Sequence, residues 1–262
     1  MPVCPCFTAR LSESGLAAVP EDLIANRKAA LFTGCFANYY YPEVGKAMVE
    51  VLEHNGVKVI VPDQMCCGLP MIAKGNNNGA YRNIVRNTAA LHHAIADGYG
   101  ILTTCSSCLL FIKRHYAQVG GRTAVEVANC TYHFSEYLLK LHEKGDLDLA
   151  FRSMHQTVFY HTPCHLKAAE IGQPTLELLG LIPGLKIRHV SAECCGMGGA
   201  YGYEKTNYRL ATEIAGKLIE ETNEYPSDRV VTDCGGCKQQ IEAGCGLKAE
   251  HPVILVQEAY SA

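Results

Sequence analysis

The chain has 262 residues, of which 48% are hydrophobic and 19% are charged. This composition is typical of a globular protein and excludes a disordered one. The formal net charge of −3 gives no basic excess for binding nucleic acid. No apolar run reaches the roughly 18 residues of a membrane-spanning helix, and the first residues lack the basic and apolar parts of a secretion signal. We therefore expect a cytoplasmic protein without a transmembrane segment.

Cysteine is the unusual feature of the composition, with 14 copies in the chain. Disulfides are disfavoured in a reducing cytoplasm, and a chain of this length does not need them to hold its fold. Metal binding or redox chemistry therefore accounts better for so many cysteines.

Residues 1–28 show little periodicity, and we interpret them as an N-terminal extension. They contain Cys4 and Cys6, which are either additional metal ligands or part of a mobile tail. Two cysteines cannot complete a site by themselves, so both alternatives stay open.

Residues 29–145 alternate between buried strands and amphipathic helices. A strand is predicted at 29–33, ending at Gly34 and Cys35. Pro42 then opens a helix whose apolar residues recur at helical spacing until Gly56. The later predicted elements are strands at 57–61, 101–104 and 124–127, a helical stretch ending near residue 96, and a helix carrying residues 134–141.

The same order returns in residues 146–262, after the charged and irregular stretch at 143–156. The cysteine landmarks repeat at a nearly constant offset of about 129 residues, which indicates an internal duplication. In this half, strands are predicted at 157–162, 185–190, 229–233 and 253–256. We therefore predict two domains, one at 29–145 and the other at 146–262.

The alternation of strands and helices predicts an α/β fold of two pseudo-symmetric repeats. Each repeat should be a mostly parallel sheet flanked by helices. Ligands of open α/β sheets bind beyond the carboxyl ends of the strands, and every motif cysteine follows a predicted strand. We expect these thiols to gather at one edge of each sheet.

Ten cysteines form a doubled pattern of a single cysteine, a Cys-Cys-Gly and a C-x-x-C. Thiolates are the usual ligands of iron–sulfur clusters. Five per repeat is too many for a four-coordinate zinc ion, and adjacent cysteines suit a body of several iron atoms better than a single ion. We predict two clusters, the first held by Cys35, Cys66, Cys67, Cys105 and Cys108, and the second by Cys164, Cys194, Cys195, Cys234 and Cys237.

Three other interpretations compete with the clusters. The cysteines could bind zinc in a stabilised interaction scaffold, or the C-x-x-C pairs could be reactive dithiols of a disulfide oxidoreductase. They could also be packed as small apolar residues, which is the interpretation we prefer for Cys130 and Cys245, outside the pattern.

Two histidines flank the first cysteine of the second set. His161 and His165 could each tune a cluster by hydrogen bonding, donate a proton to a substrate or cap local backbone. We take His165, next to Cys164, as the candidate catalytic residue.

The doubled cysteine pattern resembles the family of cysteine-rich (CCG) domain iron–sulfur oxidoreductases, which includes the B subunits of heterodisulfide reductases. The residues around Cys35, around Cys164 and His165, and from Cys194 to Tyr203 are more similar to the branch formed by the C subunits of anaerobic glycerol-3-phosphate dehydrogenases. The resemblance covers about residues 28–260.

This resemblance implies that each set of five cysteines holds a [4Fe–4S] cluster of the noncubane type. It implies an electron-transfer subunit of an oxidoreductase, with a flavoprotein dehydrogenase or a ferredoxin-type protein as donor and quinone as acceptor. A reductase that itself acts on a disulfide or quinone at the second cluster is the alternative. Association with the inner face of the cell membrane is also implied. Longer relatives carry an N-terminal ferredoxin module, for which this chain has only Cys4 and Cys6.

Overall fold

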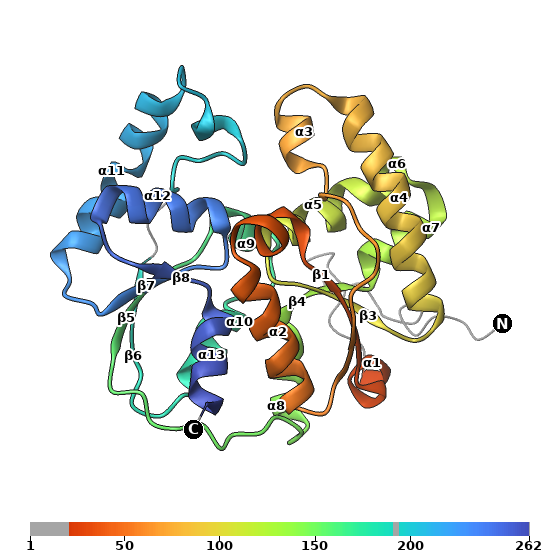
Figure 1. Cartoon of the computed structure of the whole chain (residues 1–262), viewed down its shortest axis with the longest axis horizontal. Coiled ribbons are helices and arrows are strands. Elements are labelled where there is room, and N and C mark those ends of the chain that lie inside the picture. Colours follow the sequence, from red (N-terminus) through yellow and green to blue (C-terminus); the bar gives the residue numbers. More distant parts are fainter. Residues whose placement is uncertain (1–20, 191–193, 262) are drawn as a thin grey trace.

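The computed structural model describes residues 21–190 and 194–261 of the chain. The first half builds a four-stranded sheet from β1 (Lys28–Phe32), β2 (Lys58–Ile60), β3 (Gly100–Thr103) and β4 (Thr131–His133). The second half builds another from β5 (Thr157–His161), β6 (Lys186–Val190), β7 (Arg229–Val231) and β8 (Ala249–Glu250). The two halves lie beside each other, as Figure 1 shows. Cys4 and Cys6 lie outside the described residues.

Both sheets are parallel in every pairing and share one strand order, β2-β1-β3-β4 in the first and β6-β5-β7-β8 in the second. The predicted α/β fold of two repeats is therefore confirmed. In each sheet the first strand is followed by the edge strand on one side of it, and the chain then crosses back to form the third strand on its other side. The connections that follow the two adjacent strands leave in opposite directions, and this leaves a crevice at the carboxyl ends of those strands. The two strands are β1 and β3 in one half and β5 and β7 in the other.

Helices cover the faces of both sheets. The first half contains α1 (Glu21–Asn26), α2 (Pro42–His54), α3 (Leu69–Ala73), α4 (Asn77–Ala96), α5 (Ser106–Phe111), α6 (Ala117–Val119), α7 (Gly121–Asn129) and α8 (Phe134–Glu143), with π-helical turns η2 (Phe36–Tyr40) and η3 (Ile112–Tyr116). The second half contains α9 (Cys164–Ala168), α10 (Pro174–Gly180), the 3-10 turn η4 (Tyr201–Tyr203), α11 (Tyr208–Glu224), α12 (Gly235–Cys245) and α13 (Pro252–Tyr260).

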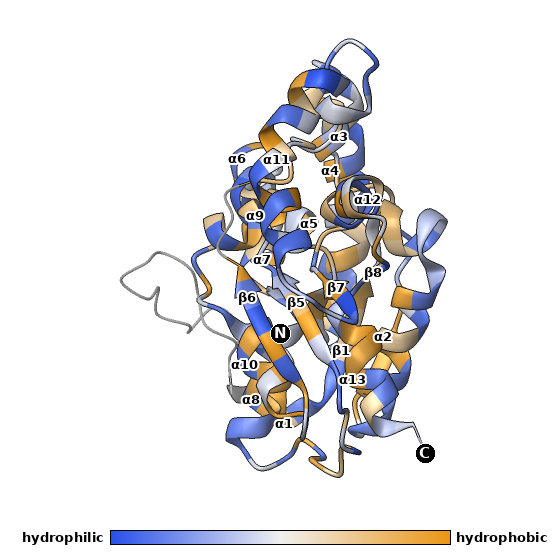
Figure 2. Cartoon of the chain, turned by 90° about the vertical axis from the view of Figure 1, so that its left-hand side faces the viewer, coloured by the Kyte–Doolittle hydropathy of each residue, from blue (hydrophilic) through white to orange (hydrophobic). Residues whose placement is uncertain are grey.

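Burial follows the position of each strand. The central strand β5 is buried along almost its whole length, whereas the edge strand β6 alternates between exposed and half-buried residues until Val190. In Figure 2 the edge strand is accordingly largely hydrophilic and the central strand is not. Strands buried on both faces are expected in parallel sheets that helices cover on each side.

Two predicted strands are wrong. Residues 124–127 belong to helix α7, and residues 253–256 belong to helix α13. The actual fourth strands are only three and two residues long, and each stands next to an apolar helix. A short apolar run cannot be assigned to strand or helix by periodicity alone, although Pro252 at the first turn was a signal for a helix.

The two halves share one hydrophobic core and exchange their last helices. Helix α13 of the second half packs on α2 of the first (Figure 1), and α8 of the first packs on α10 of the second. The core cluster accordingly joins fully buried residues of both halves, among them Leu52 and Tyr137 with Leu178 and Val256. This reciprocal packing fixes the two sheets against each other and so fixes the space between their carboxyl ends.

In the residues that the structure describes, no helix is both long and apolar enough to cross a membrane.

Candidate functional site

The motif cysteines lie on the segments that follow the carboxyl ends of strands, in loops or in the first turn of the next helix. In the first half, Cys35 follows β1, the Cys66-Cys67 pair follows β2 and Cys105 follows β3. The second half repeats this arrangement with the cysteines that follow β5, β6 and β7. Each C-x-x-C begins at the cap of a helix, with Cys105 before α5 and Cys234 before α12. The partial positive charge of a helix N-terminus favours the thiolate form of a cysteine.

The five thiols of the first set form one chain of neighbours. Cys66 exchanges hydrogen bonds with Cys35 and Cys67, Cys67 also with Cys108, and Cys108 with Cys105. Hydrogen bonds from Cys35 and Cys67 lower the pKa of Cys66 to about 3. The hydrogen bond from Cys105, a further one from Cys67 and burial raise the pKa of Cys108 well above its ordinary value. Hydrogen bonds from neighbouring thiols thus favour the thiolate form of Cys66.

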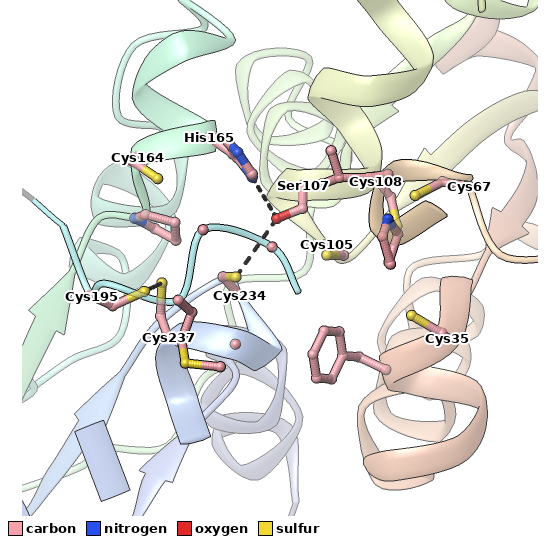
Figure 3. Close-up of a pocket in the computed structure, with 18 residues that line it drawn as sticks. Cys35, Cys67, Cys105, Ser107, Cys108, Cys164, His165, Cys195, Cys234 and Cys237 are labelled. Atoms are coloured by element: carbon pink, nitrogen blue, oxygen red, sulfur yellow. Dashed lines mark hydrogen bonds between the residues drawn. The ribbon is translucent and has the colours of Figure 1, made fainter. Parts of the chain in front are cut away.

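The second set repeats this network. Cys194 contacts Cys164 and Cys195, and the Sγ atoms of Cys195 and Cys237 lie 3.1 Å apart (Figure 3). Hydrogen bonds from Cys164 and Cys195 lower the pKa of Cys194 to about 2. The hydrogen bond with Cys194 raises the pKa of Cys195 to about 12. Cys234, hydrogen-bonded to Cys237, completes the set.

The glycine after each cysteine pair has a structural reason. Gly68 has φ +110° and Gly196 φ +79°, in the region that other residues rarely adopt. The N–H of Gly196 donates to Cys194 Sγ at 3.3 Å. A Cβ on Gly196 would lie 2.0 Å from the carbonyl oxygen of Ala211 in α11. The glycine therefore lets the cysteine loop turn directly beneath that helix.

A pocket lies between the two sets of thiols. It is open to solvent, spans about 610 Å³ when the solvent at its mouth is included, and is lined from both halves. Eight motif cysteines line it, and the other two, Cys66 and Cys194, are hydrogen-bonded to cysteines that do. The other lining residues are Phe36, Leu69, Pro70, Ser107, Pro163, His165, Met197, Gly198, Gly199 and Gly236. Figure 3 shows the labelled thiols of both sets around this space.

The donor set has the chemistry of an iron–sulfur site. Each half supplies five sulfur atoms from three loops, and thiolates are the ligands such clusters take. Within residues 21–190 and 194–261, no three Cys, His, Asp or Glu side chains are placed to hold a single metal ion.

The sequence profile of the family described as "Cysteine-rich domain" (CCG) matches the chain twice, at residues 29–113 and 158–242. The chain belongs to this cysteine-rich CCG family. The two matches contain both C-x-x-C motifs and both cysteine pairs, so the duplication and the family assignment rest on the same residues.

Several curated relatives resemble this CCG protein over most of its length. It is 34% identical to the C subunit of anaerobic glycerol-3-phosphate dehydrogenase from Escherichia coli, over 88% of this chain and 59% of the relative. It is 31% identical to the B subunit of fumarate reductase (CoM/CoB) from Methanothermobacter marburgensis, over 89% of this chain and 47% of the relative. An uncharacterized iron–sulfur protein of Methanocaldococcus jannaschii is 29% identical over 82% of this chain and 41% of the relative. The chain therefore spans about half the length of these relatives.

The fold also resembles the crystal structure of a hypothetical protein from Helicobacter pylori. The TM-score is 0.59 at 14% identity, over 90% of this chain and 49% of that one. The similarity extends to the fold alone.

The histidines of the second set differ in their surroundings. His165 lines the pocket, where its Nδ1 lies 2.7 Å from the hydroxyl of Ser107 (Figure 3). His161 is fully buried, and neither of its ring nitrogens has a hydrogen-bond partner in the described part of the chain. Burial lowers the pKa of both imidazoles, that of His161 to about 4. Both are therefore neutral N–H donors near pH 7.

Sequence reasoning missed the residues that join the two sets. Ser107 of the first C-x-x-C reaches across to His165 and lies 3.7 Å from Cys234 Sγ. Its neighbour Ser106 donates its backbone N–H and its hydroxyl to the carbonyl oxygen of Asp233, at 3.2 and 3.3 Å. The two serines between the cysteines were visible in the sequence, but nothing in one half indicated what it would contact in the other.

The cysteines outside the pattern differ in burial. Cys130 is 1% exposed in the core of the first half, but it is disulfide-bonded, so it is not only the packed apolar residue that we expected. Cys245 is a free, half-buried cysteine beside the core of the second half.

Proposed function

We propose that this CCG protein is an iron–sulfur electron-transfer subunit of an oxidoreductase. Cys35, Cys66, Cys67, Cys105 and Cys108 would hold one [4Fe–4S] cluster and Cys164, Cys194, Cys195, Cys234 and Cys237 the other, both of the noncubane type. The single observation that carries the proposal is the convergence of five thiols from three loops at the same place in each half.

The clusters would supply one-electron redox chemistry, and the protein's residues would set where it happens. The thiols of both sets lie at one pocket, and the exchanged helices α8 and α13 fix the position of one half relative to the other. A flavoprotein dehydrogenase subunit or a ferredoxin-type iron–sulfur protein is the proposed donor, and quinone the proposed acceptor. Support comes from the relatives, two of which are named as subunits of a dehydrogenase and a reductase.

Analysis of iron and acid-labile sulfide in anaerobically prepared protein tests the proposal. Two [4Fe–4S] clusters correspond to about eight iron and eight sulfide per chain, with visible absorption that a reductant bleaches. Zinc without sulfide, in a colourless and redox-silent protein, would instead identify a zinc-stabilised scaffold.

A second candidate is a reductase that acts directly on a disulfide or quinone at the second set. The open pocket favours it, because apolar residues such as Phe36, Leu69 and Met197 line it together with His165. His165 would take up a proton from solvent in the open pocket and donate it from the imidazolium to the reduced substrate, with Ser107 orienting the ring. Turnover of these substrates by the isolated, reduced chain would support this candidate, provided that His165→Ala slows turnover without loss of iron or sulfide.

A further inference from the structure

The two thiol sets have different neighbours at positions that the repeat makes equivalent. The last residue of the central strand is Phe32 in the first half and His161 in the second, and both are fully buried. The residue after the first cysteine is Phe36 in the first half and His165 in the second, and both line the pocket. Two phenyl rings therefore stand at the positions where the second set has two imidazoles.

The two C-x-x-C loops also differ in polarity, again with the polar side chains directed to the second set. The first loop contains Ser106 and Ser107, where the second contains Gly235 and Gly236. A Cβ on Gly235 would lie 2.3 Å from the ring of Phe36, so this ring occupies the space that a side chain there would need. The first loop thus places serine hydroxyls against the second half, whereas the second loop, with glycines at these positions, places no side-chain hydroxyl against the first half.

Ser107 belongs to the second site although it comes from the first half. Its hydroxyl oxygen lies 2.7 Å from His165 Nδ1 and 3.7 Å from Cys234 Sγ, as the dashed lines in Figure 3 show. When the Nδ1–H of His165 donates to this oxygen, the hydroxyl proton is directed to the sulfur. The two polar groups then form one chain of donors that ends on a thiol of the second set.

His161 adds a further donor. A buried polar group without a partner is unfavourable, and such groups in native proteins call for an explanation. Both ring nitrogens of His161 lack a partner in the part of the chain that the structure describes. His161 ends strand β5, three residues before Cys164 of the second set. A sulfur-rich body held by the second set would give its N–H the missing acceptor.

We propose that Ser107, His161 and His165 give the second site a higher reduction potential than the first, so that electrons pass from the first set to the second. The inference rests on the proposed function and deepens it. Reduction adds negative charge to the sulfur atoms, and N–H and O–H dipoles that point at them stabilise the reduced form. The phenyl rings at the first set provide no such donors.

The route between the sites is short. Ser106, next to Cys105, donates its N–H to the carbonyl oxygen of Asp233, next to Cys234. The two ligand loops are therefore in direct hydrogen-bond contact. The transfer would move one electron: the flavin or iron–sulfur donor would first reduce the first site, which would then be reoxidised as the second is reduced, and no bond would be made or broken. Quinone or another acceptor would then take electrons from the second site one at a time, and a quinone would need two such transfers and two protons to form the quinol.

Potentiometric titration of the full chain, loaded anaerobically with iron and sulfide, tests the proposal. Electron paramagnetic resonance and visible spectra are recorded, and the matched variants Cys108→Ser and Cys237→Ser assign the signals to the two sites. We expect the second site to be reduced first. Ser107→Ala should lower its reduction equilibrium constant about tenfold, which is about 59 mV for a one-electron couple, with a smaller change at the first site.

Matched variants separate this effect from misfolding. Ser107→Thr keeps the hydroxyl and should keep the potential, while His165→Phe installs the first-half residue and should lower the potential of the second site. Phe36→His makes the reverse exchange and should raise the potential of the first. Equal or reversed potentials in a chain with a full complement of iron and sulfide would overturn the inference and leave the proposed function standing. A chain that takes up no iron and sulfide would overturn both.

Discussion

Cys195 occupies a central position among the thiols of the second set. It is buried, lies 3.1 Å from Cys237 and contacts Cys194. We predict that Cys195→Ser removes the second cluster, because a hydroxyl is a poorer iron ligand than a thiolate and cluster binding is coupled to folding of the ligand loops. Iron content should fall by about half, since only one of the two proposed clusters depends on this residue.

The control for this substitution is Cys245→Ser, in the same half but outside the ligand set. Cys245 is half-buried and contacts Thr222 instead of a motif cysteine. Its replacement should leave both the iron content and the visible spectrum unchanged. A Cys195→Ser protein that keeps the signals of both clusters would remove Cys195 from the proposed ligands.

Two buried histidines at equivalent positions make the fold sensitive to acid. His133 caps α8 and His251 caps α13. The Nε2 of His251 donates to the carbonyl oxygen of Thr104 across the seam between the halves, at 2.8 Å. Burial lowers the pKa of His133 to about 3 and that of His251 to about 4, from 6.5 in each case. Both imidazoles are therefore neutral in the folded protein near pH 7.

The sign of the pH dependence follows from these values. Below pH 6.5, His133 and His251 become protonated in the unfolded chain but stay neutral in the folded protein. The free energy of unfolding therefore decreases as the pH falls from 6.5 towards 4. Each histidine contributes a slope of up to about 1.4 kcal/mol per pH unit. His251→Asn keeps a capping side chain and should reduce this slope. Thermal unfolding of both proteins between pH 4.5 and 7.5 would measure it, and parallel curves would contradict the assignment.

Among the secondary-structure elements, helix α13 contributes most to joining the halves. It belongs to the second half in sequence, but its buried Leu255 and Val256 pack in the core shared with α2. We predict that Leu255→Ala lowers the unfolding free energy by about 2–5 kcal/mol, as is usual for a truncated core leucine. Leu210→Ala, at a 47% exposed position of α11, should change it by less than about 0.5 kcal/mol. Denaturant unfolding distinguishes the two.

The sequence predicted the elements that lead to cysteines better than those that follow them. The strands before Cys35, Cys105 and Cys164 are apolar runs that end at the motif, so their composition and their position both indicated a buried strand. The fourth strands escaped prediction because they are two or three residues long and border apolar helices. Periodicity shows that a helix such as α13 has a buried face, but it does not show which helix covers that face. The exchange of α8 and α13, and with it the contact of Ser107 with the second set, therefore required the structure.

At the scale of the whole molecule, the pseudo-symmetric repeat places the pocket at the seam. Each half brings its thiols to the carboxyl edge of its own sheet, and the exchanged helices hold the two edges together. The symmetry is incomplete at two positions beside the cysteines, because His161 and His165 of the second half stand where the first half has Phe32 and Phe36. Duplication thus supplies two similar sites, and a few substitutions beside the cysteines make them chemically different.

The shared core leads to a prediction for the two halves as separate chains. A fragment of residues 1–145 would leave α2 without α13, and a fragment of residues 146–262 would leave α10 without α8, so each would expose an apolar face that the other covers. Exposed patches of this kind cause aggregation. We expect each fragment to be insoluble or unfolded alone and the two to form a soluble complex when produced together. Size-exclusion chromatography and circular dichroism would measure this outcome, and a fragment that unfolds cooperatively by itself would show that the exchanged helices are dispensable.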